Sequence, residues 1–163
     1  MGEKRTQKIL DRNAADNVYL HRDFHGALCN AIRYLDDTFG PQAVTEYLTR
    51  LGSTYFAPLS ERLATEGLSA LAEHIRSVME RENGRFTIDR CEDVLTVTVT
   101  ECPAIAHLRR TGQLYTERYC ETTVVINETI CRRAGYTSSC VYEPGQGRCV
   151  QIFRKGNKDD FLH

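Results

Sequence analysis

The hydrophobic period of this chain changes once, near Gly84, and this change constrains the fold more than any other sequence feature. Before Gly84, apolar residues recur at steps of three and four, which is typical of amphipathic helices. After it, apolar and polar residues alternate, as in Leu95, Val97 and Val99, which is typical of half-buried strands. We therefore expect an α+β fold in which N-terminal helices pack on an antiparallel sheet of about four strands.

Glycine and proline divide the first half of the chain into three expected helices. Apolar stripes predict these helices over residues 20–39, 41–67 and 68–82. Pro58 lies inside the second stripe, and we expect it to kink or interrupt that helix because proline donates no backbone hydrogen bond.

The second half is expected to form two hairpins with helical segments between them. The predicted elements are a hairpin turning at 91–93, helices over 103–110 and 117–134, and a hairpin with strands 136–143 and 148–154. A single α+β domain over residues 18–155 accounts for all of these elements. We expect a polar segment at 1–17 and a disordered tail at 156–163.

Charge and hydropathy limit the partners of such a domain. A net charge of −1 argues against nucleic acid, since there is no excess of cations to displace phosphate counterions. No apolar stretch approaches the roughly 20 residues that a membrane helix needs, and the N-terminus lacks the apolar core of a secretion signal. We expect a cytoplasmic protein with a small-molecule substrate or ligand, and formation of a homo-oligomer stays open.

Seven cysteines are the most conspicuous chemistry of the sequence. They show neither disulfide-framework spacing nor a C-x-x-C motif, so we expect mostly reduced thiols. The remaining interpretations are buried structural thiols, a catalytic thiol or a metal site. Structural thiols are the commonest case, because free cysteine packs as a small hydrophobic residue.

A metal site is one hypothesis for the first helix. His21, His25 and Cys29 follow one another at four-residue steps and so share one stripe of that helix. Two histidines at this spacing can bind one divalent metal such as zinc. The alternative is that both histidines lie at the edge of a helix interface, hydrogen-bonded to neighbours.

A cysteine nucleophile is the hypothesis for Cys102, which precedes Pro103 where a strand gives way to a helix. The free N–H groups and the dipole of a helix N-terminus favour a thiolate. His107 follows one turn later as a base or imidazolium partner. The alternative is that Cys102 only caps the helix and His107 is exposed.

The helix over 117–134 offers further candidates. Cys120 is a second candidate nucleophile or ligand, and Glu128 is a candidate general acid or base if burial raises its pKa. A solvated helix face is the alternative for Glu128. In the last hairpin, Cys140 and Cys149 fall near each other but not opposite if Glu143 pairs with Arg148, and such strand thiols usually fill a core.

Four segments carry a family resemblance. They are His21-Arg22-Asp23-Phe24-His25, Cys102-Pro103, Tyr119-Cys120-Glu121 and Gly147-Arg148-Cys149-Val150-Gln151-Ile152-Phe153. Over roughly Leu20 to Arg154 this arrangement resembles the L-2-amino-thiazoline-4-carboxylic acid hydrolase-like family. The last hairpin is also similar to the ending of the 4-vinyl reductase small-molecule-binding domains.

The first resemblance implies hydrolytic opening of a small ring containing C=N or C–N bonds, with cysteine-related metabolites as the substrate class. Its pattern positions here are His21, His25, Cys120 and Cys149. The second resemblance implies a non-catalytic module that binds a metal or a small molecule. Two sets of site residues follow from the sequence as a whole: catalytic Cys102, His107, Cys120 and Glu128, and metal-binding His21, His25 and Cys120.

The geometry of the expected fold brings most of these residues together. The histidine stripe borders the apolar face of the first helix, and Cys102 and Cys120 lie at element ends where scaffolds often present reactive groups. We predict that His21, His25, Cys102, His107 and Cys120 converge between the first helix and the sheet.

Overall fold

The computed structural model describes residues 18–157, with side chains from Phe24 onward. The polar segment predicted at 1–17 and most of the tail predicted at 156–163 lie outside the described residues. The elements, in chain order, are α1 (Val18–Phe39), α2 (Pro41–Thr54), α3 (Ala57–Glu66), α4 (Leu68–Arg81), β1 (Arg85–Cys91), β2 (Val94–Glu101), α5 (Pro103–Arg110), the 3₁₀ turn η2 (Glu117–Cys120), α6 (Glu121–Ala134), β3 (Tyr136–Glu143) and β4 (Arg148–Lys155).

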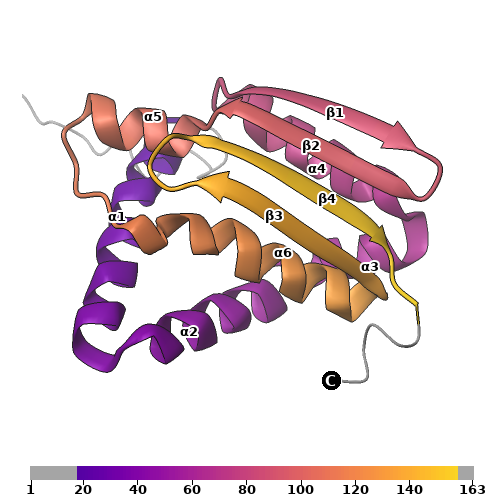
Figure 1. The fold of residues 1–163 in the computed structure, drawn as a ribbon, viewed down its shortest axis with the longest axis horizontal. Coiled ribbons are helices and arrows are strands. Elements are labelled where there is room, and N and C mark those ends of the chain that lie inside the picture. Colours follow the sequence, from indigo (N-terminus) through magenta and orange to yellow (C-terminus); the bar gives the residue numbers. More distant parts are fainter. Residues whose placement is uncertain (1–17, 158–163) are drawn as a thin grey trace, which may run out of the picture.

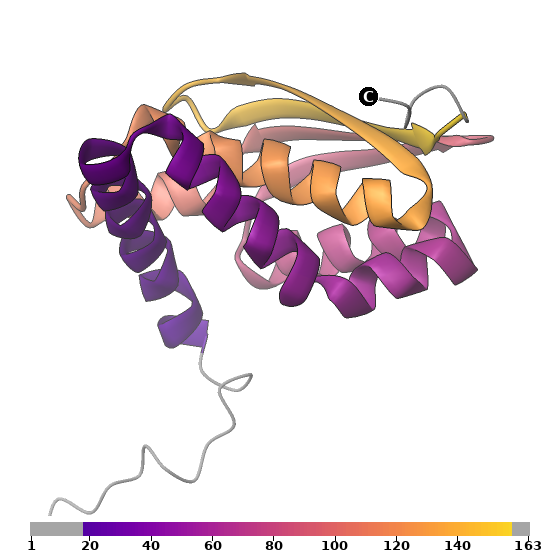
Figure 2. The same ribbon diagram turned by 90° about the horizontal axis from the view of Figure 1, so that it is seen from below.

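The described chain forms the predicted α+β fold, with the helices on one side of an antiparallel sheet (Figures 1 and 2). The change from helix to strand falls between α4 and β1, at the change of hydrophobic period. None of the described helices combines the length and the apolar character needed to cross a membrane.

The predicted second helix is two helices, so four helices of the described residues, rather than three, precede the sheet. The chain breaks at Tyr55-Phe56, and Pro58 lies in the first turn of α3. Proline is well tolerated there because the first N–H groups of a helix have no partner within it. The predicted interruption is therefore confirmed, and Pro58 starts a new helix instead of kinking one. The helix predicted over 117–134 likewise begins as η2 and continues as α6.

The sheet has the strand order β1-β2-β4-β3, so the two hairpins meet where β2 pairs with β4. In the second hairpin Glu143 pairs with Arg148, as the sequence analysis assumed. Cys140 therefore faces Gln151, and Cys149 faces Tyr142. The two thiols are diagonal neighbours on one face of the sheet, because side chains two residues apart along a strand point the same way.

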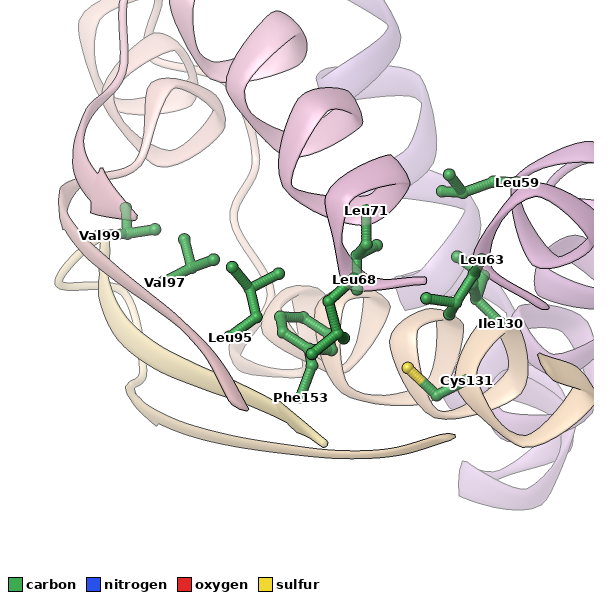
Figure 3. Packing of buried hydrophobic residues seen from close by; sticks show 10 residues of the cluster. All are labelled: Leu59, Leu63, Leu68, Leu71, Leu95, Val97, Val99, Ile130, Cys131 and Phe153. Atoms are coloured by element: carbon green, nitrogen blue, oxygen red, sulfur yellow. The ribbon is translucent and has the colours of Figure 1, made fainter. Parts of the chain in front are cut away.

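The main core lies between the sheet and the helices that cover it (Figure 3). It consists of Leu59, Leu63, Leu68, Leu71, Leu95, Val97, Val99, Ile130, Cys131 and Phe153. Because apolar and polar residues alternate along β2, Leu95, Val97 and Val99 all point into this cluster, as the strand pattern predicted. Fully burying one large apolar side chain stabilises a fold by about 1.5–3 kcal/mol.

A second core cluster holds α1 and α2 against α5 and η2. It consists of Cys29, Ile32, Val44, Leu48, Ala104, Ile105, Leu108 and Tyr119. Cys102 and Ile126 pack against both clusters. The candidate functional residues lie around this junction of the two clusters.

Candidate functional site

His25 joins three separate elements through both of its ring nitrogens. Its Nε2 lies 2.7 Å from Glu82 Oε2, and its Nδ1 lies 2.9 Å from the Tyr119 hydroxyl. His25 comes from α1, Glu82 follows the last residue of α4, and Tyr119 belongs to η2. The side chains of Glu82 and Tyr119 are buried. We call this chain of hydrogen bonds the histidine network.

The direction of each hydrogen bond in the histidine network follows from its partners. A carboxylate only accepts, so Nε2 of His25 donates to Glu82. In the neutral ring Nδ1 is then an acceptor, and the Tyr119 hydroxyl donates to it. Burial raises the pKa of Tyr119, which keeps the hydroxyl protonated. A carboxylate that fixes the histidine tautomer in this way prepares the ring to take a proton from the hydroxyl.

His107 lies beside the histidine network, with its ring centroid 6.5 Å from that of His25. It is buried, so the exposed position considered from the sequence is wrong. Arg110 Nη2 donates to His107 Nδ1 over 3.2 Å, and the Gln113 side-chain amide lies 3.5 Å from Nε2. The two histidines predicted to converge therefore do so, although Arg110 and Gln113 hold the second one.

Cys102 takes the predicted position at the start of α5, with Pro103 in the first turn. Burial raises the pKa of the Cys102 thiol. The backbone N–H groups of Ile105 and Ala104 interact with its sulfur and lower the pKa, but by less than burial raises it. The thiolate expected from the helix dipole is therefore not favoured. The charge of a Cys102 thiolate would raise the pKa of Tyr119, which places Cys102 next to the histidine network.

Cys120 ends η2 and is half-buried. Burial raises the pKa of its thiol above the ordinary value. Both thiols predicted to be nucleophiles are therefore held in the neutral form.

Cys149 on β4 behaves in the opposite way. The Cys140 thiol donates to its sulfur, the Gln151 amide donates over 3.4 Å, and together they lower the pKa of Cys149 to about 7. The same bond, with burial, raises the pKa of Cys140. Asn127 Nδ2 donates to Gln151 Oε1 over 2.9 Å and so turns the Gln151 amide hydrogens toward Cys149. This pair was expected to fill the core.

Cys102, Cys120, Cys140 and Cys149 together form what we call the thiol cluster. A negative charge on Cys149 raises the pKa of each of the other three thiols, so all four share one neighbourhood. The turn between β3 and β4 lies against the start of α5 (Figure 1), where the Cys102 N–H donates to the Gly147 carbonyl over 2.8 Å. Arg109 also donates to the Gly145 carbonyl of that turn.

The metal hypothesis gains no support from this arrangement. Within the described part of the chain, no three His, Cys, Asp or Glu side chains are placed to hold a metal ion. The side chain of His21 lies outside the described residues, and Cys29 is buried, accepting a hydrogen bond from the Thr116 N–H over 3.3 Å. A metal bound by His21, His25 and Cys120 therefore stays a prediction.

Glu128 does not join the site. It lies on the exposed face of α6 and forms an ion pair with Arg132 at 2.9 Å, so the solvated helix face is the correct interpretation. The acidic residue that does reach the site, Glu82, was missed, because the sequence marks it only as the end of a helix before Asn83-Gly84.

Tyr119, Gln151 and Asn127 were also missed as functional residues. The first two stand within the motifs that carry the family resemblance, and this was the one sequence signal that pointed toward them. Asn127 gave no such signal, since its hydrogen bond to Gln151 depends on how α6 packs against β4.

Comparison with known proteins adds no assignment to this geometry. No protein family model matches the chain, and no curated protein or solved structure matches it either. The histidine network and the thiol cluster are therefore the features of this chain that indicate a function.

Proposed function

We propose that this protein is a thiol-dependent hydrolase that opens a C–N or C=N bond of a small heterocycle of the amino-thiazoline type. One observation carries the proposal: the part-buried Glu82–His25–Tyr119 hydrogen bonds lie beside several thiols. Opening such a ring needs proton transfer to the nitrogen that leaves, and a sulfur nucleophile is one way to attack its carbon. The family resemblance supplies the substrate class.

The histidine network supplies the proton transfer in this proposal. As water attacks, its proton passes to the Tyr119 oxygen while the Tyr119 proton passes to His25 Nδ1. Glu82 stabilises the imidazolium that forms, because it accepts from the opposite ring nitrogen. The same proton returns to the ring nitrogen that leaves. Such a positioned group typically contributes about 10²- to 10⁴-fold in rate.

The second candidate is a non-catalytic module of the 4-vinyl reductase kind that binds a small molecule or a metal. The observation that favours it is the raised pKa of Cys102, Cys120 and Cys140, which makes these thiols neutral packing groups around a ligand. A divalent metal such as zinc belongs to this candidate. Elemental analysis of protein purified without added metal tests it directly.

We place the activity in the cytoplasm, where thiols stay reduced. All seven cysteines of the chain are free thiols in the structure. Thiol titration in denaturant, on protein isolated without reductant, is expected to find most of them free. Recovery of several disulfides from natively isolated protein would contradict this placement.

The decisive experiment is incubation of the purified full chain with 2-amino-thiazoline-4-carboxylic acid. We expect a product that is heavier than the substrate by one water, measured by liquid chromatography and mass spectrometry. Tyr119→Phe should lower kcat by about 10²- to 10⁴-fold, whereas Tyr34→Phe, which changes an exposed tyrosine, should not. Tight calorimetric binding of the same compound without any turnover would instead support the binding module.

A further inference from the structure

We propose that Cys149 is the nucleophile of this site, and that Cys140, Gln151 and Asn127 position and activate its sulfur for attack on the carbon of a cationic amidine. The amidine class rests on the proposed function. The reactivity of Cys149 does not, because it follows from contacts within the second hairpin and α6.

The first support is a two-step chain of side-chain amides. Gln151 Nε2 donates to Cys149 Sγ over 3.4 Å, and Gln151 Oε1 accepts from Asn127 Nδ2 over 2.9 Å. An amide whose oxygen is already engaged has only its N–H groups to offer on the other side. Gln151 is buried, so this donor is fixed in a place where water competes little.

The second support is the diagonal pair on β3 and β4. Cys140 faces Gln151 in the register, which sets its thiol beside Cys149 on the same face of the sheet. Diagonal strand neighbours have Cα atoms about 7–8 Å apart, which is beyond the usual reach of a disulfide. The register therefore places Cys140 as a neighbour of Cys149 and not as its disulfide partner.

The third support is the contrast among the four thiols. A charge on Cys149 acts on Cys140 of β3, on Cys102 just after β2 and on Cys120 of η2. Burial is the largest cause of the raised pKa of Cys102 and Cys120, and the hydrogen bond to Cys149 is the largest cause for Cys140, so Cys149 is the one thiol of the four whose pKa is lowered. Cys149 is also only partly buried, whereas Cys29 and Cys131 are closed off in the core.

The Cys149 thiolate determines the kind of electrophile. A protonated amidine presents a planar, positively charged carbon, which a buried negative sulfur attracts. In the addition step the S–C bond forms, and the π pair of the C=N⁺ bond moves to nitrogen and cancels its charge. The step needs no proton, oxidant or metal, and it leaves a neutral adduct.

The first test needs no substrate and no variant. The full chain is treated with iodoacetamide over a range of pH, and the rate at each cysteine is read by peptide mapping. The sulfur displaces iodide, so the rate follows the thiolate fraction. We expect Cys149 to react first, with a midpoint near pH 7. Reaction of Cys102 or Cys120 before Cys149 at that pH would overturn the assignment.

Variants then test the activating residues. Cys140→Ala and Gln151→Leu should each move the Cys149 midpoint upward by about one to two pH units, the usual worth of a hydrogen bond to a charged group. Cys140→Ser keeps a donor and should move it less, and Asn127→Ala should cause a smaller shift than Gln151→Leu. Cys91→Ser, at an exposed thiol, is the matched control and should cause none. Unchanged midpoints in variants with wild-type circular dichroism would refute the role of these donors.

Turnover separates this inference from the proposed function. If the amino-thiazoline is hydrolysed, Cys149→Ser should abolish product formation and Cys91→Ser should leave it unchanged. Loss with Cys102→Ser but not with Cys149→Ser would overturn the inference alone. If no substrate is turned over while Cys149 still reacts first with iodoacetamide, the hydrolase proposal fails and the reactive thiolate stands.

Discussion

The two core clusters of the molecule have similar sizes but differ in the groups that surround them. The buried residues of the cluster under the sheet are all hydrophobic, and they come from the helices and from strands in which apolar and polar residues alternate, as the sequence predicted. The cluster between α1 and α5 borders polar groups: His25 is hydrogen-bonded to Glu82, and the His107 ring lies beside the His25 ring. Apolar burial explains the first cluster, although the thiols of Cys102 and Cys149 pack against it. Beside the second cluster, polar groups form hydrogen bonds in surroundings with little water, where such bonds are stronger.

The largest expected effect is on the cluster under the sheet. Phe153 is fully buried, and Phe153→Ala should lower the free energy of unfolding by about 3–5 kcal/mol because it leaves a cavity. Urea unfolding followed by circular dichroism measures this. A loss below about 1 kcal/mol, which is closer to a surface change, would mean that this cluster is not the stabilising one.

A smaller loss of stability with a large loss of function is expected in the histidine network. Glu82→Ala removes the buried acceptor of a partly buried ring nitrogen of His25, which costs about 1 kcal/mol. Turnover should fall with it, since the histidine loses its fixed tautomer. Glu80→Ala, at an exposed position of the same helix end, is the control. Normal turnover in Glu82→Ala would separate this network from catalysis.

Two thiols at the cluster under the sheet, Cys149 at its edge and Cys131 inside it, should give the pH dependence of stability opposite signs. The pKa of Cys149 is lowered from 9.0 to about 7, so between these values the unfolded chain binds more protons and stability rises with pH. Burial raises the pKa of Cys131 to about 12, so from pH 9 to 12 the folded chain keeps the proton and stability falls with pH.

Urea titrations at several pH values measure these slopes, with Cys149→Ser and Cys131→Ala as the variants that reduce them. Cys131→Ala should make the fall above pH 9 less steep without abolishing it, because other buried thiols also have raised pKa values. Equal slopes in wild type and Cys149→Ser between pH 7 and 9 would show that Cys149 is protonated in the folded protein.

The smallest effect is expected at the surface of α6. The exposed Glu128–Arg132 pair is spaced by four residues, and such pairs contribute about 0.3–0.5 kcal/mol. Glu128→Gln should therefore change stability by no more than this and leave turnover unchanged. A clear loss of turnover would restore Glu128 as an acid or base.

Periodicity predicted the fold because the helical and alternating patterns report local burial, which each segment carries in its own residues. The turn residues predicted that Cys140 and Cys149 lie near each other but not opposite, and the Cys102-Pro103 step predicted the position of Cys102 at a helix start. The ranking of the thiols could not be predicted in this way. Burial raises the pKa of Cys102 by more than the N–H groups of the helix N-terminus lower it. The donors to Cys149 include a side chain on the neighbouring strand, which the sequence does not reveal.

Glu82 shows the same limit more sharply. A carboxylate at the end of an amphipathic helix usually points into water, and nothing near it in the sequence says otherwise. The folded chain buries it and gives it a histidine from α1, 57 residues away along the chain. Residues whose role depends on such long-range contacts have no local signature.

The hydrogen bond between His25 and Tyr119 joins residues that are 94 positions apart, so the ribosome makes one partner well before the other. A ribosome adds about 5–20 residues per second, so His25 leaves the synthesis site roughly 5–20 s before Tyr119 exists. Cys140 and Cys149 follow later still. During that interval the nascent chain contains the N-terminal helices but lacks Tyr119 and Cys149. A chain that stops before β4 has no Cys149 at all. The reactive centre is therefore completed only when nearly the whole domain has been made.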